Sequence, residues 1–199
     1  MGARSDAKLK MVQAAKQLMR ERGYHATAFS DVLKLSGAPR GSVYFHFPDG
    51  KTQLATAAAE AHAHEQVEII DRAAEQADSA AALIEGYVDL GRDGMVASGY
   101  ARGCAIAPLV VEGATQESPE IDETGRRTFS EMIDRLAFHF ITFGVDQAAA
   151  RALADAVIAG VEGAMITSRA RRSPAPYDAV KAALTAYAAS VSRPRRATR

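Results

Sequence analysis

Residues 27–47 read TAFSDVLKLSGAPRGSVYFHF, a pattern typical of two short helices joined by a tight turn. Gly37 stands where the turn needs a residue that adopts a left-handed conformation. The expected helices cover residues 28–36, capped at or near Thr27, and residues 39–46, with Pro39 in the first turn. The residues expected to pack inward are Phe29, Val32, Leu33, Val43 and Phe47. The stretch is therefore interpreted as a helix-turn-helix.

The second of these helices carries hydrogen-bonding side chains that are expected to point away from the core. A helix-turn-helix places such groups in the major groove of DNA. Arg40 can bind guanine through two hydrogen bonds, and Ser42, Tyr44 and His46 suit phosphates and base edges. Lys51 begins the next expected helix, where its ammonium and the helix N-terminus can hold a phosphate together. A hairpin that buried Arg40, Tyr44 and His46 would leave polar groups without partners, so DNA binding is favoured.

The charge distribution agrees with a DNA-binding N-terminal segment, although the chain of 199 residues has no net charge. Residues 1–60 hold nine basic and five acidic residues, a net charge of +4. Residues 61–192 hold 11 basic and 19 acidic residues, a net charge of −8, and residues 193–199 add four arginines. A basic head on an acidic body is typical of a chain that meets phosphate at one end.

The remaining sequence predicts an all-α fold, because helix-forming residues dominate and alternating β-branched runs are missing. Further helices are expected near 5–22, 51–75, 79–98, 118–143, 146–172 and 177–191, with a short apolar segment at 104–111. We expect a DNA-binding domain at 1–50 and a ligand-binding and dimerisation domain at 51–192, with the helix from Lys51 as connector. Residues 193–199 are expected to be a disordered basic tail.

The frame of residues around the helix-turn-helix resembles the TetR family of repressors. The matching segments are Gly23-Tyr24 with Thr27, Asp31 to Leu33, Ser36 to Ala38, and Arg40 to Phe47. The resemblance implies DNA contacts from Thr27, Arg40, Gly41, Ser42, Tyr44, His46 and Lys51. Two departures are Ala28, where the family often has Ser or Thr, and the Pro48-Asp49-Gly50 turn, which is one residue longer than usual.

The C-terminal part resembles the LmrA/YxaF-type subgroup through the segments 103–107, 118–120 and 168–173. This resemblance implies a repressor that is released from a pseudo-palindromic operator by a small hydrophobic, often aromatic, molecule. Residues expected to line its pocket are Tyr87, Cys104, Phe129, Met132, Leu136, Phe140 and Met165. An ordinary hydrophobic core would account for the same residues.

A homodimer is expected, because small residues recur every four positions on one predicted helix and let a second helix approach closely. These small residues are Ala152, Ala156, Gly160 and Ala164. The last helix adds Val180, Leu184 and Tyr187 on one face. By the TetR resemblance, the two helices pair with their copies as a four-helix bundle.

Other function classes receive little support from the sequence. His62 and His64 point about 200° apart on a helix, which does not make a metal site. Catalytic glycine and serine motifs and cofactor fingerprints are missing, so neither an enzyme nor a cofactor is expected. The single cysteine and the lack of a long apolar run favour a cytoplasmic protein without a membrane anchor. A ligand-independent DNA-binding protein stays open as an alternative, as does an activator instead of a repressor.

Overall fold

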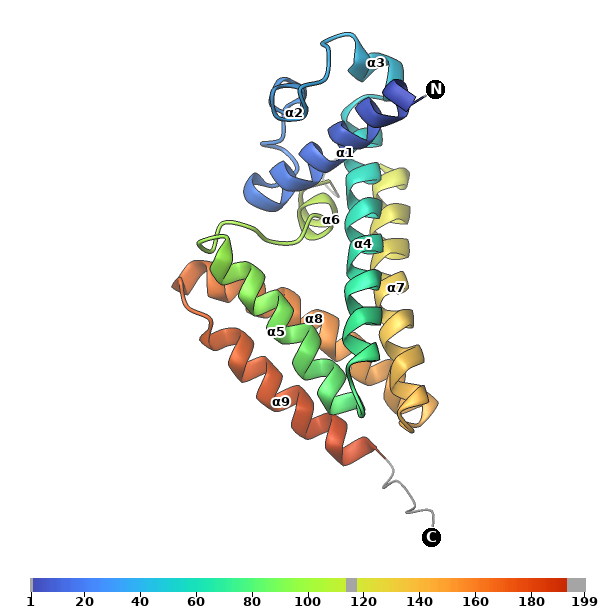
Figure 1. The fold of residues 1–199 in the computed structure, drawn as a ribbon, viewed down its shortest axis with the longest axis vertical. Coiled ribbons are helices and arrows are strands. Elements are labelled where there is room, and N and C mark those ends of the chain that lie inside the picture. The colour runs from blue at the N-terminus through green and yellow to red at the C-terminus, as the bar shows by residue number, and fades with distance from the viewer. Residues whose placement is uncertain (1, 114–117, 193–199) are drawn as a thin grey trace. The chain divides into compact units, whose positions relative to one another are not determined.

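The computed structural model describes residues 2–113 and 118–192, and over these residues the chain forms nine α-helices and no strand (Figure 1). The helices are α1 (Gly2–Arg22), α2 (Phe29–Ser36), α3 (Ser42–His46), α4 (Lys51–Glu75), α5 (Ala80–Ala97), α6 (Ala107–Gly113), α7 (Pro119–Thr142), α8 (Gln147–Arg171) and α9 (Ala175–Val191). The all-α prediction is confirmed. The expected basic tail, residues 193–199, lies outside the described residues.

Helices α5 and α8 begin at side-chain caps, Ser79 and Asp146. The side chain of Asp146 accepts a hydrogen bond from the Ala148 backbone N–H at 3.0 Å, as predicted for the start of α8. The prediction that a helix begins at Pro39 is wrong, because α3 begins only at Ser42. Both the backbone N–H and the hydroxyl of Ser42 donate to the Pro39 carbonyl, at 2.9 and 2.7 Å. Residues 39–41 therefore form a turn ahead of the helix.

The chain divides into two compact units, which are described separately. The first unit comprises Met1–Glu65 and Arg102–Phe129, and the second comprises Gln66–Ala101 and Ser130–Arg199. Helices α4 and α7 contribute residues to both units. The predicted domains, 1–50 and 51–192, divide the chain by expected function, whereas these units divide it by compactness. The predicted domains stay a proposal.

The first unit is built around α1, which packs on α2 and α3. Buried residues of α1 and α4 form its core; they include Met11, Ala15, Leu18, Met19, Leu54, Ala58 and Ala59. Polar contacts tie α4 to the first half of α7: the Thr56 hydroxyl donates to Glu120 at 3.1 Å, and Arg127 pairs with Glu60. These contacts hold α4 along a helix from a distant part of the chain.

His62 is a buried polar side chain on α4 in the first unit. Burial lowers the pKa of His62 below 6.5, and the positive charges of Arg20 and Lys16 lower it further. The Glu65 carboxylate opposes this shift but does not cancel it. The His62 imidazole and the Lys16 ammonium lower the pKa of Glu65 from 4.5 to about 2. The Nδ1 atom of His62 lies 3.9 Å from Glu65, too far for a hydrogen bond, whereas Lys16 approaches Glu65 to 3.0 Å. Lys16 is thus the closer partner of the carboxylate.

We expect the free energy of unfolding to fall as the pH drops below 6.5. In this range His62 binds a proton in the unfolded chain, whereas the buried ring stays neutral because its pKa is lower. The slope approaches about 1.4 kcal/mol per pH unit between pH 6.5 and the lower folded pKa. The stabilisation from Glu65 is present above pH 4.5 and is lost as the pH falls toward 2, so urea unfolding between pH 6.5 and 5 separates the contribution of His62 from that of Glu65. His62→Gln is expected to remove this slope, and His64→Gln on the exposed face of α4 to keep it. Equal slopes in both variants would contradict the assignment.

The second unit is a layer of helices in which α5, α8 and α9 pack on one another (Figure 1). Its buried residues include Leu83, Ile84, Val88, Leu153, Val157 and Ile158. Helices α8 and α9 meet closely at Gly160, where an added Cβ atom would lie 2.9 Å from Val180 and 3.4 Å from Leu184. A side chain at position 160 would therefore require Val180 to shift.

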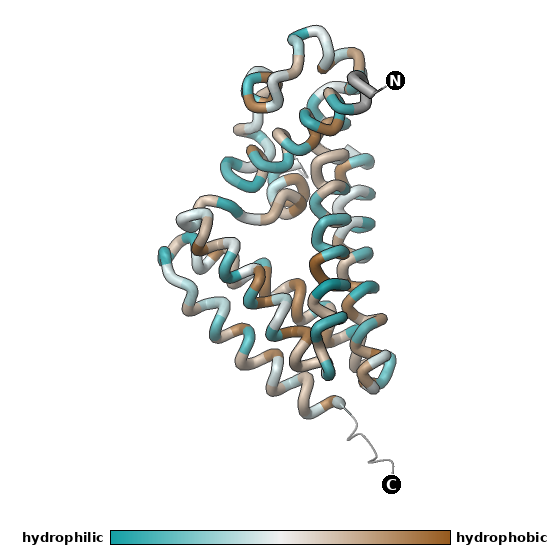
Figure 2. The backbone as a smooth tube through the Cα atoms, in the orientation of Figure 1, coloured by the Kyte–Doolittle hydropathy of each residue, from teal (hydrophilic) through white to brown (hydrophobic). Residues whose placement is uncertain are grey.

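None of the helices in the described ranges combines the length and the apolar character that crossing a membrane requires. In Figure 2, hydrophilic and hydrophobic residues alternate along α4 and α5. This alternation is typical of helices with one buried and one exposed face.

Candidate nucleic-acid interface

The helix-turn-helix is formed by α2, the turn at Gly37 and α3. Gly37 has φ +68° and ends α2 by donating its backbone N–H to the Leu33 carbonyl at 3.0 Å. The Ser36 hydroxyl donates to the same carbonyl and accepts the Ala38 N–H. Leu33 thus receives two bonds where the helix ends, and the predicted role of Gly37 is confirmed.

The inner side of α3 is fixed by Val43 and by Phe47, which follows the helix; both are almost completely buried. Four of the predicted contact residues lie on the remaining surface: Arg40, Gly41 and Tyr44 are exposed, and His46 is half-buried. The Tyr44 ring lies 6.4 Å from the Phe29 ring of α2. Arg40 and Tyr44 therefore share one surface.

A concave surface of about 600 Å³ lies between α2 and α3. Its apolar walls include Phe29, Leu33 and Val43, and it also includes the cations Lys34 and Arg40. Both cations are exposed, and positive charge beside a recognition helix favours DNA phosphates. Lys34 was not among the residues predicted from the sequence.

Thr27 and Ser42 use their hydroxyl groups within the protein. Thr27 is 5% exposed and donates to the Gly23 carbonyl at 2.7 Å, while the cap position of α2 belongs to Ala28, which makes no side-chain bond. Thr27 therefore lies directly before the cap, one of the two positions predicted for it, and its burial takes it off the proposed reading surface. Ser42 is half-buried and bonds the turn before α3.

The Lys51 side chain packs against the loop before α2 and does not extend freely into solvent. Its ammonium donates to the His25 carbonyl at 2.9 Å and lies 4.8 Å from the centre of the Tyr24 ring. Burial lowers the pKa of Lys51, and the Glu112 carboxylate partly opposes this shift. The side chain stabilises the loop, so a phosphate contact from Lys51 would compete with these bonds.

Glu112 of α6 also binds the loop before α2. Its carboxylate accepts the His25 backbone N–H at 2.6 Å, and it lies beside Gly23, which ends α1 with φ +90°. A Cβ atom on Gly23 would stand 2.3 Å from the Glu112 carboxylate oxygen. The clashing oxygen is Oε1, while Oε2 of the same carboxylate accepts the His25 N–H, so the carboxylate must shift to make room.

Gly23→Ala is expected to destabilise the protein by about 1–3 kcal/mol, because alanine is strained at this φ and displaces Glu112. The free energy of unfolding in urea measures the loss. Gly94→Ala is the matched control, since Gly94 lies inside α5 with no atom near its Cβ position. That change should be neutral or stabilising by up to about 1 kcal/mol. Equal stabilities of the two variants would contradict the assignment.

Phe45 is exposed on α3, although the sequence analysis did not include it. An apolar side chain is usually expected in the core, so Phe45 was not considered as a surface residue. Val43 and Phe47 both point inward, and a residue two positions from each must then point outward. The spacing of the buried neighbours was the signal that could have identified Phe45.

The predicted ligand-pocket residues divide between the two units. Tyr87, Met132, Leu136, Phe140 and Met165 belong to the second unit, and Cys104 and Phe129 to the first. Leu136 and Phe140 are fully buried, and the Tyr87 hydroxyl donates to Gln66 at 3.2 Å. The thiol of Cys104 accepts the Ile106 N–H at 3.2 Å. Buried positions of this kind fit a core as well as a pocket lining.

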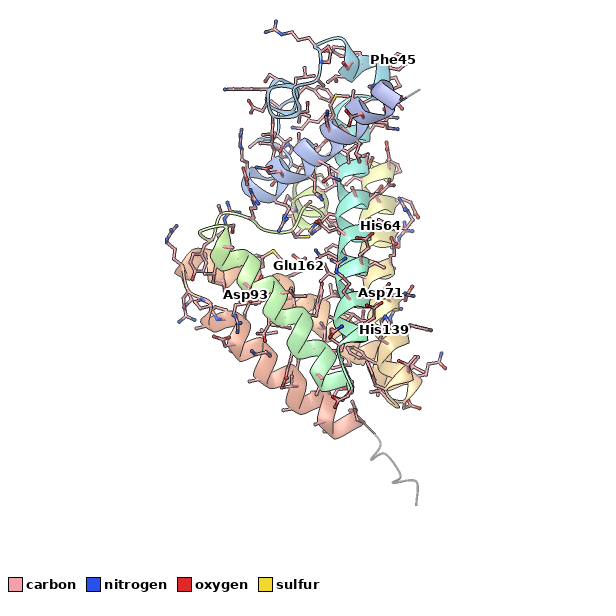
Figure 3. All side chains as sticks on the ribbon, viewed as in Figure 1. Phe45, His64, Asp71, Asp93, His139 and Glu162 are labelled. Carbon is pink, nitrogen blue, oxygen red and sulfur yellow. The ribbon has the colours of Figure 1, made fainter. Side chains whose placement is uncertain are left out.

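A polar cluster lies beside these residues in the second unit, where α4 meets α7 (Figure 3). The Asp71 carboxylate accepts a hydrogen bond from Arg135 at 2.7 Å and lies 2.7 Å from His139 Nε2. Arg135 and His139 lower the pKa of Asp71. The paired groups satisfy one another and fix the second half of α7 against α4.

The predicted dimer residues that belong to α8 fall on two different faces of that helix. Ala152 is exposed and Ala156 half-buried, whereas Gly160 contacts Val180 and Leu184 of the same chain and Ala164 is buried. A strict four-residue spacing rotates by about 40° at each step around an α-helix, so the stripe turns from the surface into the core. Gly160, Ala164, Val180 and Leu184 therefore serve packing within the chain. Tyr187 is 41% exposed.

Comparison with known families covers both parts of the chain. The model described as bacterial regulatory proteins, tetR family, matches residues 11–58. The model described as transcriptional regulator LmrA/YxaF-like, C-terminal domain, matches residues 80–183.

Curated relatives include an uncharacterized HTH-type transcriptional regulator of Mycobacterium tuberculosis, which is 36% identical over 86% of this chain and 88% of its own. The HTH-type transcriptional regulator LmrA of Bacillus subtilis is 48% identical over 25% of this chain and 27% of its own. A regulatory protein TetR from Rhodobacter sphaeroides has the same fold, with a TM-score of 0.78 and 23% identity over 91% of this chain and 98% of its own. The chain is therefore a transcriptional regulator, not an enzyme, and belongs to the TetR family with an LmrA/YxaF-like C-terminal domain.

Proposed function

We propose that the protein is a homodimeric repressor that binds a pseudo-palindromic operator through α3 of each subunit and is released by a small hydrophobic molecule. The observation that carries the DNA-binding part is the surface of α3. Val43 and Phe47 anchor the helix, while Arg40 and Tyr44 project into solvent. The protein is proposed to act in the cytoplasm.

Arg40 is the principal base-reading residue in this proposal. Its exposed guanidinium lies in the turn before α3, where it can reach a guanine edge with two hydrogen bonds. Lys34 and Arg40 share the concave surface between α2 and α3, so Lys34 is assigned to a neighbouring phosphate. Tyr44 and His46 remain proposed contacts of the same surface.

The dimer is proposed to form through the exposed faces of α8 and α9. Small and apolar residues recur on α8 at alternating steps of four and three; they are Ala152, Ala156, Ala159, Gly163, Ile166 and Ala170. The exposed face of α9 repeats the pattern with Ala175, Ala179, Ala182, Ala186 and Ala189. This alternation keeps a stripe on one face of a helix and suits pairing with a second helix. Tyr187 borders the α9 stripe, and two such helices per subunit would give a four-helix bundle.

The ligand site is proposed in the second unit, near the inward residues of α7. Met132, Leu136 and Phe140 offer a continuous apolar stripe, and Tyr87 supplies one polar point. Aromatic hydrophobic compounds should raise the melting temperature and weaken operator binding in parallel. A set of such compounds that changes neither quantity would favour a ligand-independent DNA-binding protein.

Selection of bound duplexes from a random pool, at a stated salt concentration, tests the DNA-binding proposal. The expected product is a palindromic consensus with a guanine in each half-site that Arg40 reads. A pool that stays random after several rounds would overturn sequence-specific regulation by this chain.

A further inference from the structure

Phe45 lies on the outward side of α3, beside the exposed Tyr44. Each residue advances about 100° around a helix, so Phe45 lies opposite the side on which Val43 and Phe47 enter the core. The side chain is 67% exposed, and Figure 3 shows it on α3. A helix that enters the major groove by its outward face would bring this ring to the base edges.

The ring of Phe45 lies beside the ring of its neighbour in the chain, His46. Its centroid lies 4.9 Å from that of His46, at an interplanar angle of 84°. The His46 ring in turn lies 6.5 Å from the ring of the buried Phe47. The ring of Phe45 therefore has an aromatic neighbour on one side and is open to solvent elsewhere.

The chemistry of the side chain limits what it can recognise. Phenylalanine has no donor or acceptor, so pressing it against the polar edges of guanine, cytosine or adenine removes water without replacing its hydrogen bonds. The C5-methyl group of thymine is the apolar feature of the major groove. A thymine methyl group therefore matches Phe45 best.

We infer that Phe45 is a specificity-determining residue that contacts the C5-methyl group of one thymine in each operator half-site. This inference rests on the proposed function, because it requires α3 to lie in the major groove. It assigns a second base position to the recognition helix, beside the guanine proposed for Arg40.

Replacing thymine with deoxyuridine tests the contact, because deoxyuridine pairs identically and lacks only the methyl group. Each thymine of the selected operator is replaced in turn, first in one half-site and then in both. At one position, the affinity of the wild-type protein should fall about 4-fold for one half-site and about 15-fold for both, the loss expected for one buried methyl group.

Variants of the protein complete a double-mutant cycle. Phe45→Ala should bind the thymine and deoxyuridine duplexes equally, whereas Phe45→Leu should keep part of the difference. Leu35→Ala, which truncates another exposed apolar residue of the same unit, should keep all of it. Urea unfolding of each variant checks that the fold is intact.

Two kinds of failure can be distinguished. Sequence-specific binding with no deoxyuridine effect, or with the same effect in wild type and Phe45→Ala, overturns the role of Phe45 and leaves the proposed function standing. A protein that selects no sequence at all overturns the proposed function itself.

Discussion

Ile166→Glu is expected to convert the dimer into monomers and to weaken operator binding by about 100-fold or more. Ile166 is 66% exposed and lies in the stripe of small and apolar residues on α8. Two-fold symmetry would place the new carboxylate in the interface twice, where burial of unpaired charge is costly. Loss of the dimer removes the linkage between two reading helices, and such linkage contributes about 10²–10⁴ to affinity.

Sedimentation velocity and operator titration measure the two consequences of Ile166→Glu together. Leu90→Glu is the matched control, because Leu90 is an exposed leucine on α5 of the same unit and belongs to neither stripe. It should remain a dimer and keep its affinity. A dimeric Ile166→Glu protein with normal affinity would show that the proposed face of α8 is wrong.

Arg40→Ala is expected to have an effect of comparable size, by removing a pair of hydrogen bonds to guanine from each half-site. Each good bidentate contact contributes roughly 1–3 kcal/mol of discrimination, so two half-sites together lose roughly 2–6 kcal/mol. Binding titrations against the consensus and against duplexes changed at the guanine measure this loss. The variant should bind both duplexes with similar affinity.

Lys34→Ala separates base reading from electrostatic attraction. If Lys34 binds a phosphate, its loss weakens all sequences about equally and lowers the salt slope by about 1 per subunit. Arg40→Ala should instead act mainly on the consensus. An Arg40→Ala protein that still discriminates against the changed guanine would remove Arg40 from the reading surface.

The sequence was sufficient for features that depend on neighbouring residues. Asp146 caps α8 and Gly37 ends α2 through contacts within a few positions, so composition and spacing identify them. The start of α3 was less predictable. Pro39 suits the first turn of a helix and also suits a tight turn. In the structure it lies in a turn, because the Ser42 N–H and hydroxyl both donate to the Pro39 carbonyl.

Contacts between distant segments were beyond the reach of sequence patterns. Lys51 bonds the carbonyl of His25, and Glu112 bonds its N–H from 87 positions away. Spacing also could not decide which face of α8 is buried, because α9 supplies Val180 and Leu184 against Gly160. The buried and exposed stripes of α8 are both rich in small residues, and packing alone distinguishes them.

The central claim is that two copies of this chain read two related half-sites of one DNA duplex. The mass of the complex on the selected operator, measured by sedimentation equilibrium, tests it most directly. Two chains per duplex are predicted, with half-site centres separated by about 10 base pairs or a multiple of that spacing, and a single half-site should bind about 100-fold more weakly. One chain per duplex on an asymmetric site, with equal affinity for an isolated half-site, would contradict it.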